Sequence, residues 1–298
     1  MKIIVVWRDV FRKFSLPLLM CCTLSANAQE NHLKDQHETA LREYQREEAA
    51  ATDNSNKASA LRGEAAELDS LNRTADALST INRALGMIDS NARKPFVATK
   101  AGILFNMNQP QAAVEILASE IEATRKNANS VSSTQRAGIL GTFTEGFITA
   151  TFSYMQLEQW GDAIMTLVDA ESPAEGPSFY AYKALVYRYI IARAKNPALV
   201  NPILDEMANF YAKHDAGHYG ALLRMWSGED ADKEISMIID KMDGAEQQDA
   251  LAESLFYRAA HQKFVKGNSQ EALTMLNDMN TLAPYGSIEW IYGRRVLK

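Results

Sequence analysis

Residues 147–170 read FITATFSYMQLEQWGDAIMTLVDA, and this stretch decides the fold. It holds two small residues twelve positions apart, Thr151 and Ala163, and each is followed by a large apolar residue three or four positions later. Residues at these spacings share one face of a helix, so the stretch predicts two helices joined by a turn. The small residue in each helix allows the two helices to pack closely.

The same pairing recurs three more times along the chain. The residues predicted to pack the four units together are Ala65 with Ala77, Ala101 with Ala113, Thr151 with Ala163, and Ala260 with Ala272. A repeated unit of this size is typical of helical arrays, in which no unit buries its apolar face alone. We therefore expect an all-α fold.

The units resemble the tetratricopeptide repeat (TPR), a helix-turn-helix with large-small-large packing positions and a late proline. Leu61, Ala65 and Leu68 follow this pattern in the first unit, and Pro284 closes the last. The resemblance implies a right-handed superhelical array of helix-turn-helix repeats, a TPR-like α-solenoid. The last unit departs from the pattern at Lys263, where an apolar residue is expected, and we expect a shift of register there.

Two further units are expected in the middle of the chain, and both are degenerate. Their small residues are Ala184 with Ala198, 14 apart, and Ala221 with Ala231, 10 apart. This makes about six TPR-like repeats over residues 57–285. The longest interval between units contains the polar residues 124–135, which predict either longer flanking helices with a solvated turn or a partner-binding loop.

Residues 1–28 predict a signal peptide. Four basic residues within positions 2–13 precede an apolar run of about 11 residues, which is too short to span a bilayer. Ala26-Asn27-Ala28 then supplies a cleavage site. We expect a periplasmic or secreted chain cleaved after Ala28.

Both cysteines, Cys21 and Cys22, lie inside the predicted leader. The mature chain then has no disulfide and no thiolate metal site. Met20 argues against a lipoprotein, because lipid attachment at Cys21 needs a small residue before the cysteine.

Without the leader the chain is acidic. The leader holds four basic residues and one acid, which leaves 27 basic and 36 acidic residues, a net charge of −9. Nucleic-acid binding needs clustered positive charge, so we expect no nucleic-acid partner. No later stretch is long and apolar enough to predict an integral membrane segment after processing.

Both ends of the array predict caps. Residues 29–56 predict an N-terminal capping helix, with a thin apolar stripe of Leu33, Leu41 and Tyr44, followed by a polar linker. A dimerising arm is the alternative for this helix, which leaves a homodimer open. Residues 286–298 predict a C-terminal capping helix.

The resemblance also implies a binding surface, because the concave face of TPR arrays is lined by non-packing positions of the first helices. Projected onto this sequence, the groove residues are Phe105, Phe152, Met155, Tyr182, Arg188, Tyr189, Tyr257, Arg258 and His261. Aromatic and arginine side chains dominate binding hot spots, so such a groove suits an extended or helical peptide. The alternative is that several of these aromatics pack against neighbouring helices.

No pattern predicts catalysis. His214 and His218 have the spacing of a helical metal site, but Ala216-Gly217 between them predicts a turn and no third ligand is near. The sequence holds no nucleophile elbow, phosphate loop or metalloprotease motif. We therefore assign no catalytic residue, metal or cofactor.

These patterns favour a non-enzymatic exported adaptor or scaffold that binds a protein or peptide segment on its concave face. The alternative is an immunity-type protein that neutralises an envelope-targeted toxin, which the acidic charge and the leader fit equally. A metal-dependent activity at His214 and His218 is a third hypothesis.

Overall fold

The computed structural model describes residues 31–298, so the predicted signal peptide lies outside the described part. Within that part every regular element is a helix, and no strand is present. This confirms the all-α prediction. The right-handed superhelix stays a prediction.

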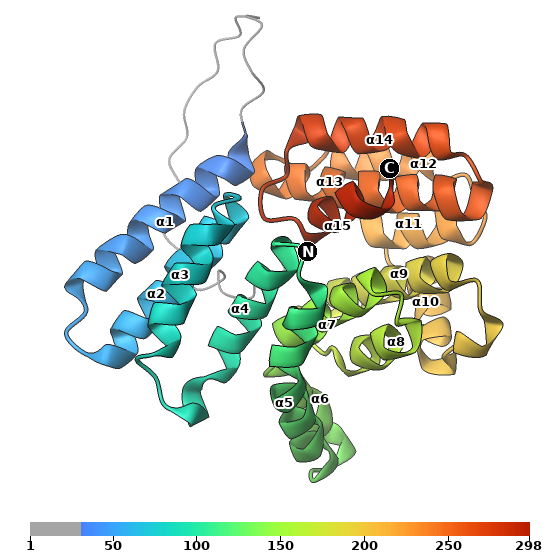
Figure 1. Cartoon of the computed structure of the whole chain (residues 1–298). Helices are drawn as coiled ribbons and strands as arrows, with labels where there is room; N and C mark the ends of the chain where they lie inside the picture. The colour runs from blue at the N-terminus through green and yellow to red at the C-terminus, as the bar shows by residue number, and fades with distance from the viewer. Residues whose placement is uncertain (1–30) are drawn as a thin grey trace, which may run out of the picture.

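The helices follow one another along the chain with short connections (Figure 1). Their bounds are α1 (His32–Ala50), α2 (Asn54–Ser70), α3 (Thr74–Leu85), α4 (Lys94–Asn106), α5 (Pro110–Asn129), α6 (Ser133–Gly141), α7 (Thr144–Gln156), α8 (Trp160–Asp169), α9 (Pro177–Ala194), α10 (Pro202–His214), α11 (His218–Trp226), α12 (Asp232–Ile239), α13 (Gly244–His261), α14 (Ser269–Leu282) and α15 (Ile288–Val296). Short elements are the 3₁₀ turns η1 (Ser90–Ala92) and η2 (Pro197–Leu199) and the π-helical turn η3 (Gln262–Lys266).

Consecutive helices pack as neighbouring pairs. The pairs are α2 with α3, α4 with α5, α7 with α8, α9 with α10, α11 with α12, and α13 with α14. The predicted packing residues of the four regular units all lie in these pairs with no exposed surface: Ala65, Ala77, Ala101, Ala113, Thr151, Ala163, Ala260 and Ala272. Their small side chains allow the two helices of a pair to approach closely.

Unit four differs from the prediction. Ala198 is exposed in the turn η2 rather than packed in a second helix. That helix, α10, begins only at Pro202, where Asn201 accepts hydrogen bonds from the first-turn backbone N–H groups. The buried small residues of α10 are Ala208 and Ala212, so the predicted spacing of 14 was wrong.

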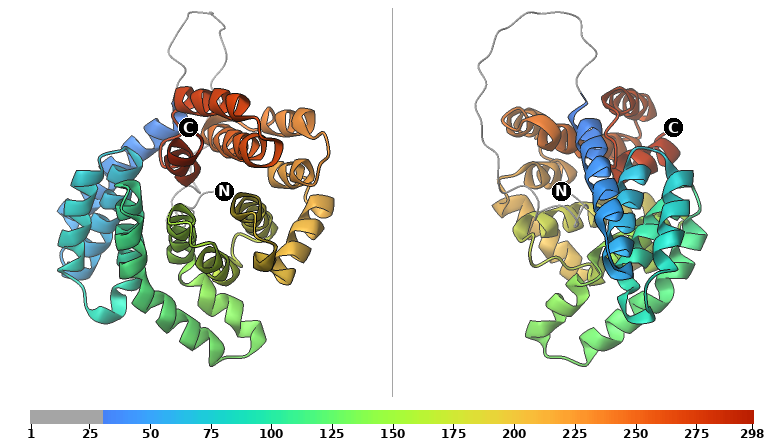
Figure 2. Two further views of the ribbon diagram at one scale, coloured as in Figure 1. Left: turned by 45° about the vertical axis from the view of Figure 1, so that its right-hand side comes forward. Right: turned by 90° about the vertical axis from the view of Figure 1, so that its left-hand side faces the viewer.

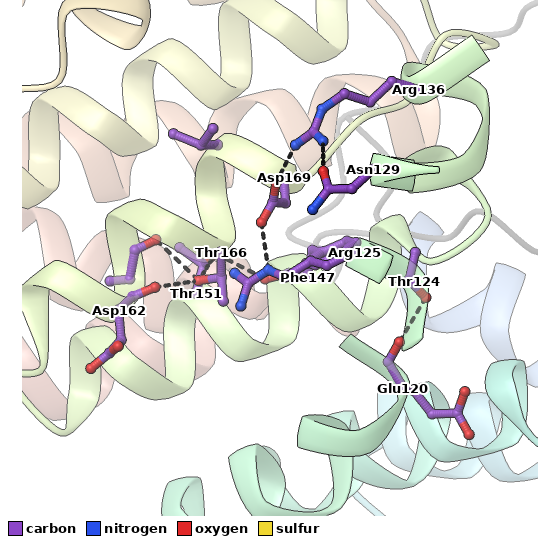
Figure 3. A network of polar contacts seen from close by, with 12 residues as sticks. Glu120, Thr124, Arg125, Asn129, Arg136, Phe147, Thr151, Asp162, Thr166 and Asp169 are labelled. Carbon is purple, nitrogen blue, oxygen red and sulfur yellow. Dashed lines mark hydrogen bonds and ion pairs between the residues drawn. The ribbon is translucent and has the colours of Figure 1, made fainter. Parts of the chain in front are cut away.

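The polar residues 124–135 form longer helices rather than a free loop. Helix α5 continues to Asn129, and α6 follows after a short turn. Arg125 donates to one carboxylate oxygen of Asp169 at 2.7 Å, and Arg136 donates to the other at 3.2 Å (Figure 3). Since Asp169 ends α8, this ion pair network fastens the segment to the next unit. The prediction of longer flanking helices is confirmed.

Helix α1 joins the two ends of the array. It packs against α2, as predicted for a cap, and also against α13 (Figure 2). We call these end-to-end contacts the clasp: Asn31 Nδ2 donates to Ala283 O at 2.9 Å, Leu33 N–H to Gln248 Oε1 at 3.0 Å, and His37 Nε2 lies 3.1 Å from Tyr285 O. The predicted polar linker is shorter than expected, because Asp53 already caps α2.

Candidate binding groove and the helix inside it

The C-terminal helix α15 does more than cap the last unit. It packs against α13 and α14. Its side chains also contact α4, α7 and α9. Helices from four units therefore surround this nine-residue helix. We call the surface facing it the groove; it consists of the side chains of Phe152, Tyr182, Tyr189, Phe256 and Tyr257 and the carbonyl groups of Phe105 and Asn106.

The first turn of α15 places a carboxylate in the groove. Glu289 is 3% exposed, and its Oε1 accepts hydrogen bonds from the hydroxyl groups of Tyr182 at 2.8 Å and Tyr257 at 3.4 Å. Burial, reinforced by the charge of Glu253, raises the pKa of Glu289 to about 8. The groove therefore favours the protonated form of this side chain.

Glu253 on α13 anchors a second set of contacts next to Glu289. It accepts a hydrogen bond from the hydroxyl of Tyr219 at 2.6 Å, and its Oε2 lies 3.1 Å from Nε2 of His218. His218 is thus turned into the core at the start of α11, whereas His214 is exposed at the end of α10. The predicted turn between the two histidines is confirmed.

The middle of α15 contributes an aromatic side chain. Tyr292 has no exposed surface, and its ring lies 5.6 Å from that of Phe152, 5.8 Å from Tyr189 and 6.0 Å from Phe256. The hydroxyl of Tyr189 donates to that of Tyr292 at 3.0 Å. Aromatic rings at these separations add to the stabilisation from area burial, and the hydroxyl bond satisfies the buried polar end.

The last turn of α15 supplies a cation. Arg295 donates to the carbonyl groups of Phe105 at 2.8 Å and Asn106 at 3.0 Å, and its guanidinium carbon lies 4.8 Å from the Phe105 ring centroid. These carbonyls end α4, where backbone acceptors lack helical partners and the helix dipole attracts positive charge. Arg295 also donates to the side chain of Gln156 on α7. Arg294, in contrast, lies over the Trp290 ring of α15 itself.

The expected shift of register in the last unit is present and contacts α15. The π-helical turn η3 covers the position of Lys263 and is followed by Gly267, whose φ of 73° is readily adopted only by glycine. Lys263 Nζ donates to the carbonyl groups of Val296, at 3.1 Å, and Lys298. The irregularity at the end of α13 therefore places a donor at the C-terminus of α15.

Five of the projected groove residues contact α15. They are Phe105, Phe152, Tyr182, Tyr189 and Tyr257. Each is at most 1% exposed, so the prediction that they line an open groove is wrong for this structure. The physical reason is that α15 fills the space that a bound peptide was expected to take.

The remaining four projected residues lie elsewhere. Met155 is buried, and His261 lies against the ring of Trp226. The other two are the arginines, and both form ion pairs with neighbouring helices: Arg188 with Asp205 of α10 at 2.8 Å, and Arg258 with Asp232 of α12 at 3.0 Å. These two side chains connect helices within the array and, within residues 31–298, form no hydrogen bond or ring contact with α15, so their assignment to a binding surface stays a prediction.

The contribution of α15 to this site was not predicted from the sequence. Glu289, Tyr292 and Arg295 recur every three residues, and an acid within an apolar turn was a usable signal. Helices of this length at the end of an array are usually caps, so the pattern was assigned to capping.

Comparison with known proteins does not place the chain in a family. No family profile matches the sequence, and no curated protein matches it. The class of the protein is therefore defined by its fold: an all-α protein built of helices packed in neighbouring pairs. In residues 31–298 no helix combines the length and the apolar character needed to cross a membrane. The same residues hold no group of three or more His, Cys, Asp or Glu side chains that could bind a metal ion.

Proposed function

We propose that the chain is an exported, non-enzymatic adaptor of the TPR-like type, and that its groove binds a helical segment of a partner protein. One observation carries this proposal: side chains from four units converge on a helix, the chain's own α15. The leader pattern in residues 1–28 supports export.

The chemistry of the contacts supports recognition of a helix. Helix-in-groove binding uses a few anchor side chains spaced along one side of the helix. Here the anchors are Glu289, Tyr292 and Arg295, and each meets a different set of partners in the groove. Tyrosine and arginine are also the side chains that contribute most to binding hot spots.

Site-specific photo-crosslinking in intact cells tests this proposal. One variant carries a photoreactive amino acid in place of Gln156, a half-buried residue at the edge of the groove. The matched control carries it in place of Phe210, which is 52% exposed on α10. We expect a partner protein to crosslink from position 156 and not from position 210.

The outcome separates the alternatives. Crosslinking from position 210 alone, or from neither position, contradicts a partner site in the groove. If the captured partner is a toxin, the adaptor role gives way to the immunity role. The N-terminal residue of the protein purified from the envelope fraction tests export, and residue 29 is the expected start.

A further inference from the structure

We infer that α15 is a built-in competitor for the groove, and that a partner displaces it with a helix carrying an acid, a tyrosine and an arginine at successive three-residue spacings. This inference rests on the proposed function, because it names the partner and the regulation of the same site.

The chain changes direction between α14 and α15 in a connection that contains two residues with left-handed backbone. Residues 283–287 join α14 to α15, and they include Ala283 with a φ of 47° and Gly286 with a φ of 83°. Left-handed backbone at an alanine is strained, so this turn is held by its surroundings rather than by local preference. Ser287 then caps α15 by accepting a hydrogen bond from the N–H of Trp290. The clasp also holds this connection, through the contacts of Asn31 with Ala283 O and of His37 with Tyr285 O.

The groove defines what its occupant must carry. At one end two tyrosine hydroxyls donate, so they require an acceptor such as a carboxyl group. In the middle three aromatic rings surround a tyrosine, and at the other end two backbone carbonyls require a cation. Three residues of helix rise about 4.5 Å, so these requirements follow one another along a single helix.

Docking of a helix with an acid at this position carries a cost, for α15 and for a partner helix alike. Glu289 is buried beside Glu253, and its raised pKa means that docking disfavours the ionised side chain. An attached helix nevertheless competes strongly, because its effective concentration at the groove is on the order of millimolar. A partner helix in solution must therefore bind better than α15, or α15 must first be weakened.

The test measures exchange with a peptide of the chain's own sequence. A fluorescent peptide of residues 287–298 is titrated into the full mature chain, as wild type and as Arg295→Ala. The variant loses the contacts of its attached helix with Phe105 and Asn106, while the free peptide keeps its own arginine. Charge-assisted hydrogen bonds of this kind are worth roughly tenfold or more in affinity, so we expect Arg295→Ala to bind the peptide at least about tenfold more tightly.

Arg294→Ala is the matched control. Arg294 is the neighbouring arginine of the same helix and contacts only Trp290 among the aromatic rings. We expect this variant to bind the peptide as weakly as wild type, and a scrambled peptide to bind neither variant. Equal peptide affinity of Arg295→Ala and wild type overturns the inference.

Hydrogen exchange of the wild-type chain keeps the test independent of any folding defect. If α15 is released while the array stays folded, the amides of residues 289–296 exchange faster than those of α13 and α14. Exchange of α15 only together with α13 overturns the inference. A partner crosslinked at position 156 without peptide exchange would contradict the inference and leave the proposed function standing. Peptide exchange without a crosslinked partner would contradict the proposed function and leave only the part of the inference that concerns release of α15.

Discussion

Glu289 sets the pH dependence of the contact between α15 and the groove. Its neighbours are Glu253 on α13, the hydroxyl groups of Tyr182 on α9 and Tyr257 on α13, and the charge of Asp249. Its pKa rises from the model-compound value of 4.5 to about 8 in the folded chain. A raised pKa of a carboxyl group means that the folded chain binds a proton more tightly than the unfolded chain.

The first prediction concerns this carboxyl group. Its stabilising contribution is complete below about pH 4.5 and is lost as the pH rises to about 8. Glu289→Gln keeps an acceptor for the tyrosine hydroxyls but cannot ionise. We expect thermal melts between pH 5 and pH 8 to show a smaller loss of stability in Glu289→Gln than in wild type. Glu206→Gln, at an exposed residue of α10, should melt like wild type at both values. The same pH dependence in all three proteins would contradict the assignment.

Residues with a local, repeating spacing could be placed from the sequence alone. The small packing residues, such as Ala65 and Ala163, could be predicted because their spacing is local and repeats. The aromatic residues that face inward could be projected for the same reason, as Phe152 and Tyr189 show. Their burial could not be predicted, because it depends on Tyr292, more than a hundred residues away along the chain.

At the element scale, the contact between α1 and α2 depends on a glycine. Gly63 of α2 faces the ring of Tyr44 on α1, and a Cβ atom at residue 63 would lie 2.4 Å from a ring carbon. Two helices can approach this closely only where one side chain is missing. The sequence predicted Tyr44 as part of the apolar stripe of α1, but it gave no indication of its partner.

The second prediction tests this close approach. Gly63→Ala should destabilise the chain by about 1–3 kcal/mol, because the added methyl group displaces the Tyr44 ring. Gly102→Ala is the matched control, since no atom lies within 4 Å of an added Cβ in the middle of α4. This change should stabilise by about 0.5–1 kcal/mol through helix propensity. Urea unfolding measures both, and a stabilising Gly63→Ala would show that the contact is looser than described.

In unit four the presence of a second helix could be predicted from the sequence, but the residue at which it begins could not. The pattern predicted a second helix there, and the structure has one, but it starts at Pro202 rather than near Ala198. The chain has prolines at 197 and 202, and either can start a helix. The Asn201 cap decides between them, because its side chain accepts hydrogen bonds from Ile203 and Leu204.

At the scale of the whole molecule, the clasp links the stability of the first and last units. In an open array each unit contacts only its neighbours, so the two ends open independently. Here α1 packs against α13, and His37 also lies 2.7 Å from Glu67 of α2. Opening the connection at one end should therefore expose amides at the other.

The third prediction concerns the clasp. Gln248→Ala removes the acceptor of the Leu33 N–H, which α1 itself cannot satisfy in its first turn. We expect faster hydrogen exchange both in residues 33–37 and in residues 283–287, on opposite sides of the clasp. Gln247→Ala is the control, because that side chain donates to Ile239 O within the last units. Faster exchange confined to α13 would mean that the clasp does not couple the ends.

The clasp also limits how the molecule responds to force. An open solenoid behaves as a soft spring, because small rotations between successive units add up to a large extension. A ring fastened by Asn31, Leu33 and His37 cannot lengthen in this way while those contacts hold. Tension along the array therefore loads the clasp, together with the contacts that α15 makes with α4, α7 and α9. The distance between the first and last units therefore stays nearly constant until the clasp hydrogen bonds break.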